Sequence, residues 1–394
     1  MKIYPINIFS RDDLMNICSR IGTDTRALAY LQPKANIFHL FAENIDYRAA
    51  GFLKQEMLAR GGDVAVTKHV IDGKADSSDV LIMATPSQLR SLQEKLKAMD
   101  CWGLKEFREG LSGVIKGCSV CEWRMKTPAG HELTLSHDTK IMAIVNLTRD
   151  SFFAASRVDD AGLIPVAGKF LSEGAYILDV GAESTRPGAE AVSESDELSR
   201  VVPAVRELRR EFPDALISVD TYKPEVMRAV VNEGADVIND VSGFTFGAGT
   251  PETVAELGVP YVLSHIRGTP QDMVSYEGRG DILGELSTYF AAKLEALECA
   301  GVRRENVILD PGLGFGKSEG ENFAVVRDVE SLRVFGRPVL VGHSRKRFTG
   351  GLAGTLGVSG VLAGRVSLLR VHDVSENAEV LRVAEGVRNG LVIA

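Results

Sequence analysis

The chain has 394 residues, enough for two domains, and about a quarter of them are charged, which is typical of a globular protein that folds in water. The net charge of -8 argues against general binding to nucleic acid or to an anionic membrane. No apolar run is long enough to span a bilayer, and the first residues lack the apolar core of a secretory signal, so a cytoplasmic location is expected.

The first 125 residues predict a small α/β domain. Apolar runs and amphipathic patterns indicate strands at 36–41, 63–70 and 79–84, and helices at 47–60 and 86–99. Residues 126–139 contain turn-forming proline and glycine, and they predict a linker or a short hairpin. The pair Cys118-Ser-Val-Cys121 has no second pair to complete a metal site, so reduced thiols are expected. Nothing in this part of the sequence indicates a role for the domain.

From residue 140 to residue 394, strand and helix patterns alternate. Eight short β-rich runs are predicted, at 140–147, 176–180, 216–219, 237–239, 260–264, 307–309, 338–342 and 367–371. Amphipathic helices are predicted between them, at 196–212, 224–233, 281–300 and 322–335. The rhythm and the length predict an α/β protein in which a smaller α/β domain precedes a (β/α)8 TIM barrel. A doubly wound open sheet is the structural alternative.

Polar side chains stand at the ends of several predicted strands, where a parallel barrel assembles its active site. Asp220, Asn239 and Asp310 come from three different strand ends. Carboxylates accept hydrogen bonds, and an amide both donates and accepts them. Together these groups suit a flat heterocycle rich in N–H donors, such as the amino-pyrimidinone edge of a pterin or of guanine. Taken singly, each Asp has an alternative role as the cap of the following helix.

Cation-forming side chains follow the predicted strands at the same end of the barrel. Arg186 comes after the second strand, Lys346 after the seventh, and Arg370 and His372 close the eighth. Guanidinium and ammonium groups bind phosphate oxygens, although a solvated surface charge is the alternative for any one of them. Asn146 ends the first strand, and its carbonyl oxygen suits a Mg²⁺ ion bound to phosphate.

These residues lie in segments that resemble the dihydropteroate synthase family of the folate pathway. The resemblance extends from about Ile141 to Arg388, and the segments occur in the family's order and at nearly its spacing. The segments are Ile144-Val-Asn-Leu-Thr-Arg-Asp-Ser-Phe152, Asp179-Val-Gly-Ala-Glu-Ser-Thr-Arg-Pro-Gly188, Ser218-Val-Asp-Thr-Tyr-Lys223, Ile238-Asn-Asp-Val-Ser-Gly243, Ser264-His-Ile-Arg-Gly-Thr-Pro270, Leu309-Asp-Pro-Gly-Leu-Gly-Phe-Gly-Lys317, Ser344-Arg-Lys346 and Arg370-Val-His-Asp373.

The resemblance implies an enzyme that joins 6-hydroxymethyl-7,8-dihydropterin diphosphate to 4-aminobenzoate, with two small-molecule substrates, Mg²⁺ held at Asn146, and a homodimer. The positions that match the family's catalytic residues are Asp150, Arg186, Lys346, Arg370 and His372. The positions that match its binding residues are Asp220, Asn239, Asp310 and Lys346 for the pterin, Asn146, Thr185, Arg186, Arg370 and His372 for the diphosphate, and Thr185, Pro187, Phe315 and Ser344 for the aminobenzoate.

The first strand-end loop departs from the family pattern. Arg149 stands in place of a proline, and Phe153, Ala154 and Ala155 stand where polar and glycine residues are usual. Two alternatives to the synthase share the strand-end Asp and Asn. A methyltetrahydrofolate-dependent corrinoid methyltransferase gives no reason for the cations after the last two strands. A non-catalytic pterin-binding protein is favoured only by the altered loop and the additional domain.

Overall fold

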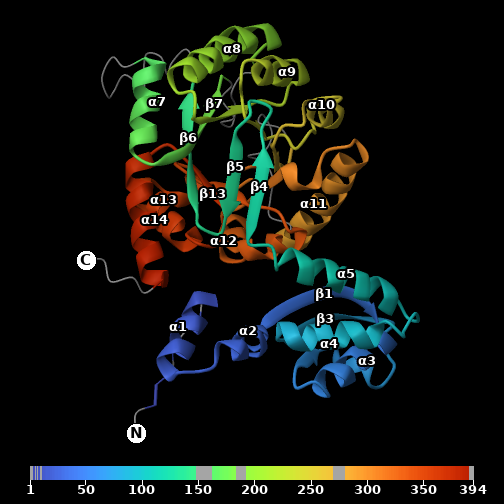
Figure 1. Cartoon of the computed structure of the whole chain (residues 1–394). Coiled ribbons are helices and arrows are strands. Elements are labelled where there is room, and N and C mark those ends of the chain that lie inside the picture. The colour runs from blue at the N-terminus through green and yellow to red at the C-terminus, as the bar shows by residue number, and fades with distance from the viewer. Residues whose placement is uncertain are drawn as a thin grey trace. The chain divides into compact units, whose positions relative to one another are not determined.

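The computed structural model describes residues 3, 4, 6, 8, 11–147, 162–182, 192–268 and 280–389. The chain divides into two compact units, Met1–Lys116 and Gly117–Ala394 (Figure 1). Each unit has its own hydrophobic core. This division comes before the boundary predicted at residue 125, because the strand that spans residue 125 belongs to the second unit. None of the described helices is long and apolar enough to cross a membrane.

The first unit is an antiparallel sheet of three strands whose buried face packs against helices. β3 (Ser77–Ala84) lies between β1 (Phe38–Asp46) and β2 (Asp63–Ala65). Every second residue of β3 is buried, because side chains alternate between the two faces of a strand. The helices of this unit are α1 (Arg11–Ile21), α2 (Leu28–Ala35), α3 (Tyr47–Leu58), α4 (Pro86–Leu96) and α5 (Leu104–Gly117), of which the last ends at the first residue of the second unit.

Four elements of the first unit differ from the sequence-based expectation. The run at 63–70 is a strand only as far as Ala65, and a 3-10 turn, Lys68–Val70, follows it. The helices α1, α2 and α5 lie outside the predicted elements, and Leu104 and Leu111 of α5 are buried in the core. The remaining strands and helices predicted for this unit are present, with bounds that differ by a few residues.

The second unit is a barrel of eight parallel strands, as predicted (Figure 1). The strands are β6 (Lys140–Asn146), β7 (Ala175–Gly181), β8 (Leu216–Asp220), β9 (Val237–Asp240), β10 (Tyr261–Ser264), β11 (Val307–Asp310), β12 (Leu340–Gly342) and β13 (Leu368–Val371). They are hydrogen-bonded in the order β11-β10-β9-β8-β7-β6-β13-β12. A parallel bridge between Leu309 of β11 and Val339, which precedes β12, links the two ends of this order. The strands are nearly continuous apolar runs because helices cover the outside of the barrel.

A helix follows each of the eight strands. The helices are α7 (Leu163–Ser172), α8 (Glu194–Glu211), α9 (Pro224–Asn232), α10 (Thr250–Leu257), α11 (Ile282–Cys299), α12 (Glu319–Arg327), α13 (Leu352–Leu362) and α14 (Val374–Asn389). The single helix predicted at 322–335 is instead α12 followed by a 3-10 segment, Val329–Phe335. The start of α12 is set by a capping box, in which Ser318 and Glu321 each accept a hydrogen bond from the other's backbone N–H.

A hairpin closes the amino-terminal end of the barrel. β4 (Glu122–Lys126) and β5 (Glu132–Ser136) pair with each other and lie in the region for which a linker or hairpin was expected. The side chains of Trp123, Met125, Leu133 and Leu135 are buried. They pack against residues in the amino-terminal halves of the barrel strands, namely Met142, Ile177, Leu216, Val237, Val262, Ile308, Leu340 and Leu368. The barrel interior therefore opens towards the carboxyl ends of the strands.

A buried carboxylate ties this hairpin to the barrel. Asp236, which has no exposed surface, accepts hydrogen bonds from Arg209 Nη2 at 2.6 Å and from the backbone N–H of Ile217 at 2.9 Å. It also accepts from His131 Nδ1 at 2.8 Å and from Thr127 Oγ1 at 2.7 Å. Thr127 and His131 flank the turn between β4 and β5.

Replacing Asp236 by alanine is expected to lower the free energy of unfolding by about 3–5 kcal/mol, because it leaves the Arg209 guanidinium without its buried partner. Urea unfolding followed by circular dichroism measures the change. Glu233→Ala serves as the control, since Glu233 pairs with Arg206 at the surface and such pairs contribute little. Equal urea midpoints for the two variants would contradict the structural role of Asp236.

Candidate active site

The polar residues predicted to bind a ligand lie at neighbouring strand ends. In the strand register Asn146 is paired with Gly181, and Gly181 is paired with Asp220. Asp220 is paired in turn with Asn239. Asp310 is the last residue of β11. All of these residues therefore lie at the carboxyl end of the barrel, opposite the hairpin.

The guanidinium of Arg370 bridges two strand-end carboxylates. Arg370 Nε donates to Asp179 Oδ2, and Arg370 Nη2 donates to Asp220 Oδ2, both at 2.5 Å. Asn239 Nδ2 donates to the same Asp179 oxygen at 3.1 Å. Because a carboxylate only accepts, this bond fixes the orientation of the Asn239 amide and leaves its Oδ1 as an acceptor. Arg370 thus contacts one predicted pterin residue, Asp220, directly and is linked to another, Asn239, through Asp179.

Burial and charge act against each other in this cluster. Burial raises the pKa of Asp220 to about 7, although Arg370 lowers it and Asp179 raises it further. Burial alone would lower the pKa of Arg370, but Asp179 and Asp220 outweigh it and raise that pKa above the usual value. Arg370 is therefore a permanent cation. Its charge makes it possible for two carboxylates to lie close together inside the barrel.

Several buried polar atoms near this cluster have no hydrogen-bond partner among the described residues. They are Asp179 Oδ1, Asn239 Oδ1, Ser218 Oγ and Ser264 Oγ. Leaving such an atom unpaired costs about 1–3 kcal/mol, so native proteins usually pair it with protein, water or a ligand. Two of these atoms can only accept hydrogen bonds, which favours a ligand that presents N–H groups.

Asp310 and Lys346 form the second half of the site. Asp310 Oδ1 accepts from the backbone N–H of Gly312 at 2.7 Å. Lys346 Nζ donates to the carbonyl of Leu313 and lies 4.1 Å from the centre of the Phe315 ring. Burial lowers the pKa of Lys346 to about 8, and Asp310 opposes that shift. Burial also raises the pKa of Asp310, while Lys346 lowers it.

The loop after β11 approaches its neighbours so closely that three of its positions require glycine. Gly312, Gly314 and Gly316 have φ angles of 63°, 78° and 65°, in the left-handed region that other residues rarely adopt. A Cβ atom on Gly312 would lie 1.9 Å from the carbonyl oxygen of His265. A Cβ on Gly316 would lie 2.5 Å from that of Arg267, and one on Gly314 would lie 2.8 Å from Lys346 Cδ.

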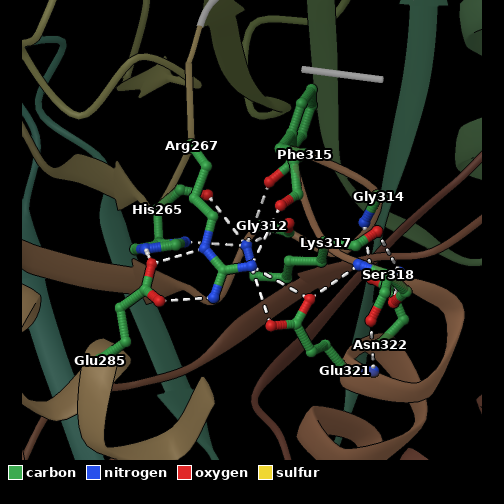
Figure 2. A network of polar contacts seen from close by, with 11 residues as sticks. His265, Arg267, Glu285, Gly312, Gly314, Phe315, Lys317, Ser318, Glu321 and Asn322 are labelled. Carbon is green, nitrogen blue, oxygen red and sulfur yellow. Dashed lines mark hydrogen bonds and ion pairs between the residues drawn. The ribbon is translucent and has the colours of Figure 1, made fainter. Parts of the chain in front are cut away.

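A network of charged residues contacts the loop after β11 (Figure 2). Arg267 Nη1 donates to both carboxylate oxygens of Glu321, at 2.9 and 3.0 Å, and Arg267 Nε donates to Glu285 Oε1 at 2.6 Å. Lys317 Nζ lies 2.8 Å from His265 Nδ1. The sequence reasoning did not identify these residues as a group, because they come from two strand-end loops and two helices. The one sequence feature that could have indicated this group is that His265, Arg267 and Lys317 lie within the segments that resemble the family.

Of the other predicted site residues, Ser344 and His372 lie in contact. The Ser344 hydroxyl lies 3.0 Å from His372 Nδ1 and accepts from the His372 backbone N–H at 3.2 Å. Asn146 is exposed at the end of β6. Eight further residues named from the sequence lie outside the described residues, namely Arg149, Asp150, Phe153, Ala154, Ala155, Thr185, Arg186 and Pro187.

Comparisons with known proteins agree with this geometry. The family model described as "Pterin binding enzyme" matches residues 142–384. A dihydropteroate synthase of Synechocystis is 38% identical over 261 residues, which cover 63% of this chain and 90% of that protein. A crystal structure of Xanthomonas albilineans dihydropteroate synthase with 4-aminobenzoic acid is 37% identical, with a TM-score of 0.61, and covers 68% of this chain and 98% of that one.

Some relatives also match residues of the first unit. A Halobacterium salinarum protein named as a probable bifunctional folylpolyglutamate synthase/dihydropteroate synthase is 37% identical over 400 residues. The match covers 98% of this chain but 47% of that protein. The barrel, its strand-end residues and the family match agree with the resemblance found in the sequence segments. The chain therefore belongs to the pterin-binding enzyme family, as one of its dihydropteroate synthases.

Proposed function

We propose that the barrel joins 6-hydroxymethyl-7,8-dihydropterin diphosphate to 4-aminobenzoate, releasing pyrophosphate and forming 7,8-dihydropteroate in folate synthesis. The observation that carries the proposal is the set of buried acceptor oxygens on Asp179, Asn239 and Asp220 beside the cation of Arg370. Acceptors of this kind suit the N–H-rich edge of a pterin, and cations suit its diphosphate. The related synthases support the same assignment.

The pterin is assigned to Asp220, Asn239, Asp310 and Lys346. Asn239 Oδ1 and the carboxylates accept from the ring N–H groups, while the Lys346 ammonium donates to a ring oxygen or nitrogen. Lys346 already lies over Phe315 and reaches the Leu313 carbonyl, so its ammonium stays at this end of the barrel. The aminobenzoate is assigned to Phe315 and Ser344, together with Thr185 and Pro187.

The diphosphate is assigned to Asn146, Arg370 and His372, with Thr185 and Arg186. Arg370 uses Nε and Nη2 for the two carboxylates, which leaves Nη1 for a diphosphate oxygen. The described residues contain no group of three His, Cys, Asp or Glu that would bind a metal alone. The single carbonyl oxygen of Asn146 therefore fits a Mg²⁺ ion held chiefly by phosphate oxygens and water. Bound there, Mg²⁺ would neutralise negative charge on pyrophosphate.

In the proposed reaction the bond between the pterin methylene carbon and the diphosphate oxygen breaks, and pyrophosphate leaves with the electron pair. Arg370, His372 and Arg186 stabilise the negative charge that develops on it. The aminobenzoate nitrogen then attacks the methylene cation and loses a proton. Asp150, in the first loop, is the remaining residue assigned to catalysis.

Pyrophosphate release from the two substrates together tests the function. The proposal requires steady-state release that depends on both the pterin diphosphate and 4-aminobenzoate. A methyltransferase would bind the pterin and release no pyrophosphate, and a non-catalytic binding protein would show pterin affinity without turnover. Omitting Mg²⁺ from the same assay tests the proposed metal, and unchanged release in the presence of a chelator would contradict it.

Asp310→Ala is expected to weaken pterin binding by about 1.5–3 kcal/mol, the range for a lost hydrogen bond to a charged group. Calorimetric titration with a pterin measures the change. Asp240→Asn provides a matched control, because Asp240 is also a buried strand-end carboxyl but accepts from Ser242 N, Phe244 N and the Tyr261 hydroxyl. Equal pterin affinity in the wild type and Asp310→Ala, with the fold intact, removes Asp310 from the site.

We also propose a homodimer and a cytoplasmic location. The dimer is supported by apolar side chains on the surface of α13 and α14, where Leu352, Val361, Val383 and Val387 are 43%, 51%, 44% and 79% exposed. Exposed apolar groups on two neighbouring helices suit an interface between subunits. The cytoplasmic location is supported by five cysteines that are all free thiols. Light scattering on the full chain tests the dimer.

A further inference from the structure

Lys317 lies at the end of the loop between β11 and α12, and it is not among the residues assigned to the substrates. Its ammonium is 2.8 Å from the Gly312 carbonyl oxygen and 2.8 Å from His265 Nδ1. The carbonyl oxygens of His265 and Phe315 lie 3.4 Å away. Burial lowers the pKa of Lys317, and the nearby Asp310 carboxylate opposes that shift. Figure 2 shows the Lys317 side chain reaching into the cluster that joins the loop after β10 to the loop after β11.

The partner of Lys317 in the neighbouring loop is a neutral histidine. Burial, with the nearby charges of Lys317 and Arg267, holds the pKa of His265 far below its usual value. Neutral imidazole has one N–H donor and one acceptor. Because the Lys317 ammonium can only donate, His265 Nδ1 is the acceptor, and Nε2 carries the hydrogen that faces Glu285 Oε1 at 3.3 Å. The ring of Tyr289 lies edge-on to His265, with 4.7 Å between the ring centres.

The loop after β11 is in contact with both Lys317 and Lys346. Lys317 binds the carbonyl oxygens of Gly312 and Phe315, whereas Lys346 binds the carbonyl oxygen of Leu313 and lies over the Phe315 ring. Glycine at 312, 314 and 316 permits the close approach but supplies no side chain to fix the backbone. The Lys317 ammonium contacts the carbonyl groups of Gly312 and Phe315 together, and these contacts restrain the backbone of the loop.

We propose that Lys317 is a positioning residue: through His265 and the carbonyls of Gly312 and Phe315, it sets the Phe315 ring and Lys346 for the bound substrates. This inference rests on the proposed function, because it assigns Phe315 to the aminobenzoate and Lys346 to the pterin. Lys317 touches neither reacting group, so its contribution to the reaction passes through the loop. Small displacements of positioned groups have large effects on rate.

Lys317→Met tests the proposal, because methionine keeps much of the side-chain length and removes the charge. Lys293→Met is the matched control: Lys293 Nζ also donates to a strand-end loop carbonyl, that of Gly243 at 2.8 Å, and lies 3.8 Å from the centre of the Phe244 ring. Both variants are expected to unfold at lower urea concentration. Only Lys317→Met is expected to lose kcat/KM, by about ten- to hundredfold, with a raised KM for 4-aminobenzoate.

A purely structural role would make the two variants alike, with lower stability and unchanged kinetic constants, and that result overturns the proposal. If Lys317→Met does not fold, His265→Leu removes one acceptor of the ammonium and leaves the carbonyls. A wild-type KM for 4-aminobenzoate in His265→Leu would then overturn it. A wild-type protein that releases no pyrophosphate would instead refute the proposed function, and it would do so before any Lys317 variant is measured.

Discussion

A fragment that begins at residue 137 is expected to lose the folded barrel, whereas a fragment that begins at residue 117 is expected to keep it. The shorter fragment lacks Trp123, Met125, Leu133 and Leu135, which cover the amino-terminal end of the barrel. Each large buried side chain that is lost removes about 2–5 kcal/mol. Four such losses together approach or exceed the stability of a typical domain, which is about 5–15 kcal/mol.

Far-ultraviolet circular dichroism and thermal unfolding of the two fragments measure this difference. A cooperative transition in the 117–394 fragment and none in the 137–394 fragment is the expected result. If both fragments melt at the same temperature, the hairpin is an accessory and not part of the barrel core. The mass of the 117–394 fragment in solution further shows whether the first unit takes part in assembly.

Arg370→Ala is expected to abolish turnover and to lower the free energy of unfolding by about 3–5 kcal/mol. The variant leaves the carboxylates of Asp179 and Asp220 buried together without the cation that bridges them. Arg345→Ala is the control, because Arg345 also forms an ion pair with a carboxylate, that of Asp373, but with its own side chain 57% exposed. Pairs that are so exposed contribute little to stability.

The destabilisation caused by Arg370→Ala is expected to grow with pH. The pKa of Asp220 in the folded protein is raised to about 7 from 3.8, and loss of Arg370 removes the main influence that lowers it. A carboxyl with a raised pKa favours folding fully below its unfolded value and loses that contribution as the pH rises through its folded value. Urea unfolding between about pH 5 and about pH 9 measures the trend. A deficit that shrinks over this range would contradict the proposed charge balance.

The barrel could be predicted because its strands are short, apolar and regularly spaced, and because polar residues stand at their ends. The sequence could predict that Asp220, Asn239 and Asp310 lie at the same end of the barrel, since parallel strands place their carboxyl ends on one side. Asp179 was not identified as the partner of Arg370. The two residues are 191 positions apart, and no local pattern connects them.

The helix α5 shows a second limit of sequence reasoning. Gly110 and Gly113 lie inside it, and glycine in a helix is unfavourable by about 1 kcal/mol relative to alanine. The local preference therefore argues against a helix at this position. Burial of Leu104 and Leu111 in the core of the first unit overrides that preference, and such burial is a tertiary effect that composition does not reveal.

The glycines of the loop after β11 restrict how this enzyme can evolve. At Gly312 and Gly316 any side chain meets backbone in a region of φ that favours glycine, so a single substitution damages the fold before it alters a ligand contact. The first loop, by contrast, has already departed from the family pattern at Arg149. An inhibitor that contacts only the glycine loop and the strand-end carboxylates would leave few routes to resistance, whereas one that reaches the first loop would contact a segment whose sequence differs from the family pattern.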